Sequence, residues 1–102
     1  MATDKPAVNF NFDTYKADAG EDYAFILDGK RHTIPSAASL KGVQFFEAAL
    51  GGDARATMHV LREVMTDAQL EKLRESANNS IPALGAFVRD YLKQGGVGAG
   101  NE

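Results

Sequence analysis

The stretch Tyr23-Ala-Phe-Ile-Leu-Asp-Gly-Lys-Arg-His-Thr-Ile-Pro35 (YAFILDGKRHTIP) decides how the fold begins. Asp28-Gly29 is a strong two-residue turn signal, because both central positions of a type I′ turn need a positive φ. Pairing the residues outward from this turn predicts an antiparallel hairpin over residues 23–34, with the facing pairs Tyr23–Ile34, Phe25–His32 and Leu27–Lys30. One face of this hairpin is apolar, and a two-stranded hairpin alone is marginally stable in water. We therefore expect helices or a further strand to cover that face.

Four helices are predicted after the hairpin, from apolar residues that recur at helical spacing. Their predicted ranges are 37–50, 54–65, 67–76 and 81–94. Ser36, Asp53 and Ser80 are candidate caps of three helices, and Thr66 with Gln69 has the spacing of a capping box. The stripes expected to face the core are Leu40, Val43, Phe46 and Leu50 on the first helix, and Ala54, Met58, Leu61 and Met65 on the second. The predicted fold class is mainly α, a compact bundle of about four helices preceded by a β-hairpin and an extended arm.

The chain of 102 residues has the length of one domain. We predict an N-terminal arm and acidic linker over residues 1–22, a single hairpin-plus-helices domain over 23–94, and a flexible glycine-rich tail over 95–102. Within the arm, residues 8–13 alternate apolar and polar, which is the period of a half-buried strand. This segment, which contains Phe10 and Phe12, either docks on the hairpin or on a neighbouring subunit, or forms a disordered leader.

Charge is distributed unevenly along the chain. Residues 1–22 carry two lysines against five acidic residues, whereas residues 23–94 carry nine basic and eight acidic residues and are nearly neutral. Nucleic-acid binding draws most of its affinity from a basic surface that neutralises phosphates. The sequence contains no basic stripe, so we expect no nucleic-acid partner.

Composition also argues against a membrane or secreted protein. The chain has no cysteine, which excludes disulfides and thiolate metal sites. No apolar run approaches the ~20 residues that a membrane-spanning helix requires. The start, MATDKPAV, lacks the basic region and apolar core of a secretory signal. We expect a cytoplasmic protein without a membrane partner.

Residues suited to catalysis or metal binding are sparse. The two histidines, His32 and His59, are far apart in the sequence, whereas metal sites need three or four convergent ligands. No serine lies in a G-x-S-x-G elbow, and Gly51-Gly52-Asp53 lacks the rest of a phosphate-binding loop. We therefore predict no catalytic, cofactor-binding or metal-binding residue, and a protein that is not an enzyme.

Because no catalytic or metal site is predicted, we expect the functional residues to lie on a binding surface. Phe45 and Val60 both lie off the predicted core-facing stripes of their helices. Phe45 is either buried under the hairpin or part of an exposed patch for self-association or for a partner helix. The candidate partner-binding residues are therefore Phe10, Phe12, Phe45 and Val60.

The order of these parts resembles the tail assembly chaperones of long-tailed bacteriophages, in particular those encoded just upstream of the tape measure protein. The resemblance lies in the arm Phe10-Asn-Phe12, the acidic linker, the hairpin Phe25-Ile-Leu-Asp-Gly-Lys-Arg-His-Thr-Ile-Pro35 and the helical body that follows. Met65-Thr-Asp-Ala-Gln-Leu70 and Phe87-Val-Arg-Asp-Tyr-Leu92 are compatible with it. As an arrangement of parts, it spans roughly residues 8–92.

The resemblance implies a role in virion morphogenesis in the host cytoplasm. Such chaperones bind the tape measure protein, keep it soluble, help tail tube protein assemble around it, and are absent from the mature virion. Many are made in two lengths by ribosomal frameshifting, so we expect a slippery run near codons 95–100 and an open frame past Glu102. The main alternative is a small structural virion protein, such as a connector or tail-completion subunit. A third is a small DNA-binding regulator.

Overall fold

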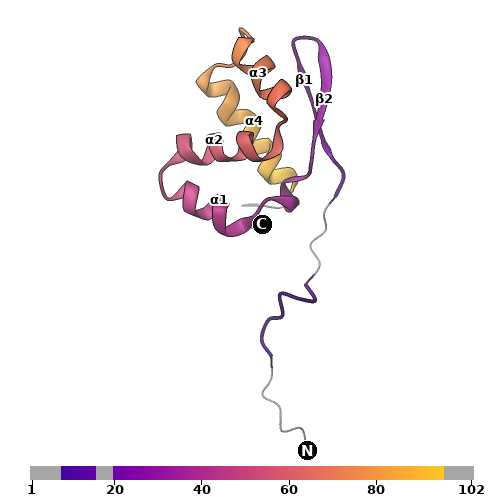
Figure 1. Cartoon of the computed structure of the whole chain (residues 1–102), viewed down its shortest axis with the longest axis vertical. Coiled ribbons are helices and arrows are strands. Elements are labelled where there is room, and N and C mark those ends of the chain that lie inside the picture. Colours follow the sequence, from indigo (N-terminus) through magenta and orange to yellow (C-terminus); the bar gives the residue numbers. More distant parts are fainter. Residues whose placement is uncertain (1–7, 16–19, 96–102) are drawn as a thin grey trace, which may run out of the picture.

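The computed structural model describes residues 8–15 and 20–95. The fold is mainly α with a small N-terminal hairpin, which confirms the predicted class (Figure 1). The strands are β1 (Tyr23–Leu27) and β2 (Lys30–Ile34), and a one-turn 3₁₀ helix, η1 (Ala37–Ser39), follows them. The α-helices are α1 (Gly42–Ala49), α2 (Asp53–Val64), α3 (Asp67–Glu75) and α4 (Ile81–Gln94).

The hairpin has the predicted turn and register. Asp28 and Gly29 have φ values of 51° and 82°, as a type I′ turn requires. The facing pairs include Tyr23–Ile34, Phe25–His32 and Leu27–Lys30. The face that carries Phe25 and Ile34 packs against the helical body, and the opposite face, which carries Ile26 and Arg31, is exposed. The helices therefore supply the cover that the hairpin needs.

Aromatic contacts fix the base of the hairpin on α4. The Tyr23 ring meets Phe87 and Tyr91 edge-on, with ring centroids 5.7 Å and 5.2 Å apart. The Tyr23 hydroxyl donates to Asp90 Oδ2 at 2.6 Å. Edge-to-face aromatic pairs add stability beyond the area that they bury, by about 0.5–1.5 kcal/mol. These contacts hold this end of the hairpin on α4.

Polar contacts fix the rest of the hairpin on α3 and the loop after it. Ser76 Oγ donates to Asp28 Oδ1 at 2.9 Å, and Ser76 is buried. Gln69 Nε2 donates to the Thr33 carbonyl at 3.1 Å. These bonds join residues that are far apart in the sequence, and the turn and capping patterns alone did not predict them.

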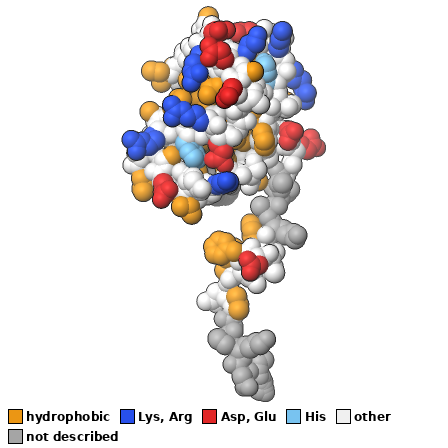
Figure 2. All heavy atoms as spheres, viewed as in Figure 1, with side chains coloured by type: hydrophobic (Ala, Val, Ile, Leu, Met, Phe, Trp, Pro, Cys, Tyr) orange, Lys and Arg blue, Asp and Glu red, His pale blue; other side chains and the backbone are white. Residues whose placement is uncertain are grey.

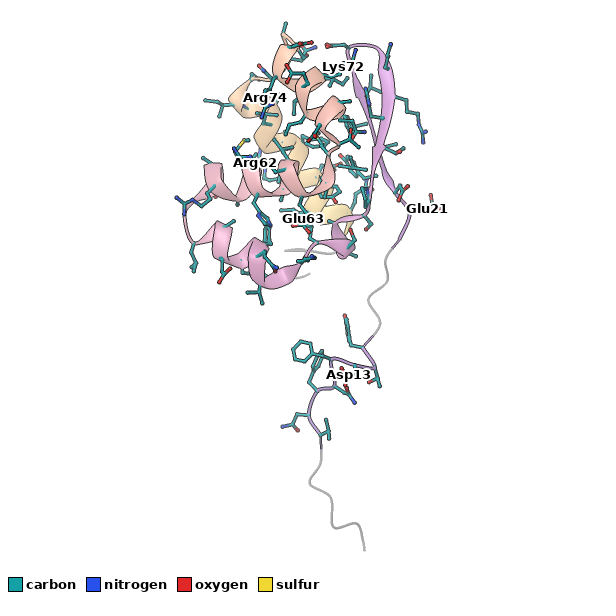
Figure 3. All side chains as sticks on the ribbon, in the orientation of Figure 1. Asp13, Glu21, Arg62, Glu63, Lys72 and Arg74 are labelled. Carbon is teal, nitrogen blue, oxygen red and sulfur yellow. The ribbon has the colours of Figure 1, made fainter. Side chains whose placement is uncertain are left out.

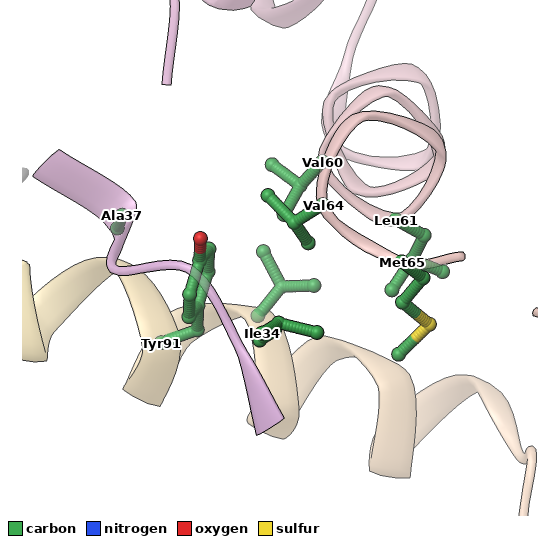
Figure 4. Close-up of a cluster of buried hydrophobic side chains, with 8 residues drawn as sticks. Ile34, Ala37, Val60, Leu61, Val64, Met65 and Tyr91 are labelled. Carbon is green, nitrogen blue, oxygen red and sulfur yellow. The ribbon is translucent and has the colours of Figure 1, made fainter. Parts of the chain in front are cut away.

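The core lies between the hairpin, α2 and α4 (Figure 4). Its buried members are Ile34, Ala37, Val60, Leu61, Val64, Met65, Val88 and Tyr91. Tyr91 is fully buried, and its hydroxyl donates to the Pro35 carbonyl at 2.5 Å. A buried tyrosine needs such a partner, because an unpaired hydroxyl would lose its hydrogen bonds with water.

The core face of α2 is wider than the predicted stripe. Leu61 and Met65 are buried as expected, but Ala54 is exposed, and Val60 and Val64 are also buried. The helix packs on α1 at one side and on α4 at the other. Residues on both sides of the stripe therefore meet apolar neighbours, and Val60, which was predicted as a candidate partner-binding residue, is fully buried in the core.

The predicted first helix, 37–50, is broken in two. Leu40 and Lys41 are extended, with ψ values of 144° and 115°, so η1 ends before α1 begins. Leu40 therefore does not share a helix face with Val43, Phe46 and Leu50, and these three side chains are exposed. The inward face of α1 carries Phe45 and Ala48 instead, and Phe45 packs against the core.

Most of the predicted helix starts are confirmed by side chains that accept hydrogen bonds from backbone N–H groups. These are Ser36 at η1, Thr66 with Gln69 in a capping box at α3, and Ser80 at α4. Asp53 differs from the prediction, because Gly52 occupies the N-cap of α2 with a φ of 102°. Asp53 lies in the first turn of α2, where its negative charge interacts favourably with the positive end of the helix dipole.

Residues 8–15 form a local turn rather than a strand. Asn11 Oδ1 accepts from the Asp13 N–H at 2.9 Å, and the Asn11 carbonyl accepts from the Tyr15 N–H at 3.1 Å. Asparagine favours such turns because its side chain bonds to the backbone two residues on. The sheet of the described residues has two strands, so the arm does not dock on the hairpin as a strand.

Gly95, which we predicted as the first residue of a flexible tail, packs in the body. It follows α4 and is half-buried. A Cβ placed on it would lie 2.4 Å from Ala37 Cβ, closer than real contacts allow. The close approach of α4 to η1 therefore requires glycine here. The rest of the predicted tail, 96–102, lies outside the described residues.

Candidate partner-binding groove

A shallow groove runs over α2, between α1 and the start of α4. One part, of about 680 Å³, lies between α1 and α2, and a second, of about 520 Å³, lies between α2 and α4. Ala54 and Met58 line both parts, so the two parts lie next to each other on α2. We call this combined surface the α2 groove, and its principal residues are Ala48, Ala54, Arg55, Met58, Arg62, Leu84 and Arg89.

The floor of the α2 groove is apolar. Ala48 of α1 and Ala54 of α2 are small, so they leave room between the helices. Met58 lies between the two parts, and methionine adapts its shape to different apolar ligands. Leu84 and the exposed Ile81 extend the apolar surface onto α4. The floor therefore suits an apolar side-chain stripe more than a polar small molecule.

Three arginines border this floor. The Arg55 side chain lies across Gly51, and the Arg89 guanidinium lies over Gly85, so both glycines let the arginines lie flat along the rim. Arg62 lies seven residues after Arg55, on the same face of α2. Figure 2 shows basic side chains along this edge of the body, with apolar side chains between them.

These arginines have no carboxylate partner in the described part of the chain. The ion pairs there are His59–Glu63 and Arg74–Glu71. Asp53 is the one acidic residue that lines the groove. The α2 groove is therefore positively charged, and its guanidinium groups are free to pair with carboxylates of a ligand.

Contacts between α1 and α2 hold one wall of the groove. His59 Nε2 lies 3.0 Å from Glu63 Oε1, without the alignment of a hydrogen bond. The Glu63 Oε2 atom accepts from the backbone N–H of Lys41 at 3.2 Å, which ties the start of α1 to α2 (Figure 3). His59 lines the groove. The described residues form no group of metal ligands around it, so we interpret His59 as part of the groove wall.

Two tyrosines at the base of the hairpin have raised pKa values. Burial raises the pKa of Tyr91 to about 12, and the negative charge of Glu63 acts in the same direction. Burial also raises the pKa of Tyr23 to about 12, with further contributions from the hydrogen bond to Asp90 and from its charge. Both phenols therefore stay protonated at neutral pH, and their hydrogen bonds hold the hairpin in place.

The four predicted contact residues do not come together in one site. Phe10 and Phe12 are exposed in the arm, Phe45 is half-buried against the core, and Val60 is fully buried. Arg55 and Arg62 were not among the predicted contact residues, although their seven-residue spacing on α2 was an available signal. Met58 was predicted to face the core, and it lies at the edge of the core and lines the groove.

No group of three or more metal-ligating side chains forms among residues 8–15 and 20–95. In the same residues, no helix is long and apolar enough to cross a membrane. Comparison with known proteins gives no matching family model, no similar curated protein and no similar solved structure.

Proposed function

We propose that this protein is a bacteriophage tail assembly chaperone that binds the tape measure protein in the α2 groove and keeps it soluble while tail tube protein assembles around it. The observation that supports this most is the groove itself, with an apolar floor and three arginines that have no carboxylate partner among the described residues. The order of arm, hairpin and helices in the sequence gives independent support.

The groove fits an amphipathic helix. Such a ligand presents apolar side chains at positions i, i+3 or i+4, and i+7 along one face. Ala54 and Met58 would meet that apolar stripe, and acidic residues beside the stripe would pair with the arginines. We therefore expect the bound segments to be helices with an apolar stripe flanked by Asp or Glu.

The length of the groove sets how many copies a long partner needs. The α2 helix has 12 residues, which corresponds to about 18 Å at the usual rise. One copy would therefore cover about three turns of a partner helix. A tape measure protein exposes long apolar helical surface that aggregates when uncovered, so we expect several copies to bind along it.

The test is co-expression of the full chain with the tape measure protein encoded beside it. We expect the pair to be soluble and to co-purify, and the tape measure protein alone to precipitate. Reversing two rim charges, Arg55→Glu with Arg62→Glu, should lose co-purification, because like charges would then face the acidic flanks of the partner helix.

The matched control is Arg31→Glu, which makes the same kind of charge change on the outer face of the hairpin. This variant should still co-purify, and circular dichroism should show that all variants are folded. An unchanged complex with the groove variant would contradict the proposed binding site. Stoichiometric amounts of this chain in purified virions would contradict a chaperone role and favour a structural virion protein.

A further inference from the structure

The outer face of α1 carries three apolar side chains that the described part of the chain leaves uncovered. Val43, Phe46 and Leu50 are 70%, 62% and 89% exposed. At about 100° per residue they share one narrow arc, on the side of α1 opposite Phe45 and Ala48. We call Val43, Phe46 and Leu50 the α1 ridge. It lies apart from the α2 groove, so it has no place in the function proposed above.

A second uncovered apolar group lies in the arm. Phe10, Phe12 and Tyr15 are 55%, 86% and 63% exposed. Their rings already pack on one another, with the Phe10 centroid 4.7 Å from Phe12 and 5.5 Å from Tyr15. The Asn11 turn holds this cluster together, so little ordering is needed before it binds a surface. We call these three residues the arm cluster.

We infer that the arm cluster of one copy docks on the α1 ridge of a second copy, and that the two copies exchange arms reciprocally. In Figure 1 α1 lies at the same end of the body as the open end of the hairpin, which follows the arm in the sequence. Two copies that meet at this end can therefore cover both groups at once. A two-fold arrangement of this kind is closed, because each copy gives one arm and receives one.

The exposed area is sufficient for a specific dimer. At these exposed fractions, the four aromatic side chains of the two groups leave about 400–660 Å² open in each copy, taking 150–250 Å² for a whole aromatic side chain. Val43 and Leu50 add to this. The total approaches the ~800 Å² per partner of a standard protein interface. An interface made by the α1 ridge alone, or by the arm cluster alone, would bury only about half of this area per partner.

Sedimentation equilibrium of full-length variants tests this inference. The wild-type chain should be a dimer at micromolar concentration. The arm variant Phe10→Ser with Phe12→Ser and the ridge variant Phe46→Ser with Leu50→Ser should each weaken dimerisation by at least about tenfold, because each removes two aromatic or aliphatic anchors. A mixture of the two variants should form heterodimers, since one intact arm and one intact ridge remain.

The control is Ile26→Ser, which removes an exposed apolar side chain from the outer hairpin face and should leave the dimer intact. A monomeric wild-type chain would overturn the inference. So would a ridge variant that is monomeric while the arm variant still dimerises, since that result indicates ridge-to-ridge pairing. Loss of the dimer in Arg55→Glu with Arg62→Glu would place the arm in the α2 groove instead. Because this assay contains no tape measure protein, its failure leaves the proposed function intact.

Discussion

The inner face of the hairpin and the outer face of α1 both present apolar side chains in regular spacing, yet only the first is covered by the rest of the chain. Ile34 in the hairpin is buried, whereas Leu50, at 89% exposed, is the most exposed of the large apolar side chains that the structure describes. The hairpin face is accompanied by polar contacts to α3 and α4, such as the bond from Ser76 to Asp28. Among the described residues, no long-range side-chain hydrogen bond reaches the three side chains of the α1 ridge.

This difference shows what fixes an apolar surface inside a small domain. The spacing of apolar residues determines which face of a helix or strand is buried. Long-range hydrogen bonds then determine on which neighbouring element that face packs. Gln69 and Ser76 are polar residues of α3 and the following loop, and both bond to the hairpin. On α1 the equivalent contact, from Lys41 to Glu63, lies on the inward side.

The largest difference in stability is expected between two truncations, one on the inner face of the hairpin and one on the α1 ridge. Ile34→Ala should lower the free energy of unfolding by about 2–5 kcal/mol, because it opens a cavity in the core. Phe46→Ala should change it by less than about 0.5 kcal/mol at concentrations where the chain is monomeric. Urea unfolding followed by circular dichroism measures both. Equal losses would show that the α1 ridge is internal.

A second comparison concerns two glycines, one in the packed body and one at the start of α1. Gly95→Ala should destabilise the protein by about 1–3 kcal/mol, since the new Cβ would overlap Ala37. Gly42→Ala should be neutral or stabilising by up to about 1 kcal/mol, because nothing lies near the new Cβ. Thermal unfolding of both variants decides this, and an unchanged melting temperature for Gly95→Ala would place residue 95 outside the body.

Alkaline pH should loosen the hairpin. The pKa values of Tyr23 and Tyr91 rise from 10.0 to about 12 in the folded chain. Above pH 10 the unfolded chain therefore loses these protons first, and stability falls as pH rises toward 12. For the buried Tyr91 the slope approaches about 1.4 kcal/mol per pH unit. Unfolding free energies at pH 9, 10 and 11 should show this fall, and Tyr91→Phe should reduce it.

The smallest effect is expected at the tip of the hairpin. Ser76→Ala removes the hydrogen bond that Ser76 Oγ donates to Asp28 and the one that it accepts from the Asn78 N–H, so it should cost about 1 kcal/mol. Hydrogen exchange of the β1 and β2 amides should rise in this variant by a factor of about five to ten. No change in exchange would show that the aromatic contacts at the base hold the hairpin without help from this bond.

The hairpin could be predicted from sequence because its determinants are local. Asp28-Gly29 sets the turn, and alternation then sets register and face, all within 13 residues. The capping box of Thr66 and Gln69 was predictable for the same reason. The face of α1 was not, because the break at Leu40 depends on how η1 packs under α4, as the contact of Gly95 with Ala37 shows.

Only some features of the α2 groove could be predicted from the sequence. Met58 and Leu61 have the same apolar character, and only the packing of α1 and α4 leaves one at a groove and the other in the core. The rim of the groove carries arginines from two helices, Arg55 and Arg62 from α2 and Arg89 from α4. Only the tertiary structure brings these helices together. Val60 is buried although it lies off the predicted stripe, because both α1 and α4 pack on α2. Phe45, for which burial was one of the two predicted alternatives, packs against the core.

The central claim is that the α2 groove, rather than the hairpin, receives the helical partner. Hydrogen exchange of the full chain, alone and in complex with the tape measure protein, tests it most directly. We predict new protection along α2 and at the start of α4, and unchanged exchange in β1 and β2. New protection confined to the hairpin, with α2 unchanged, would contradict the account.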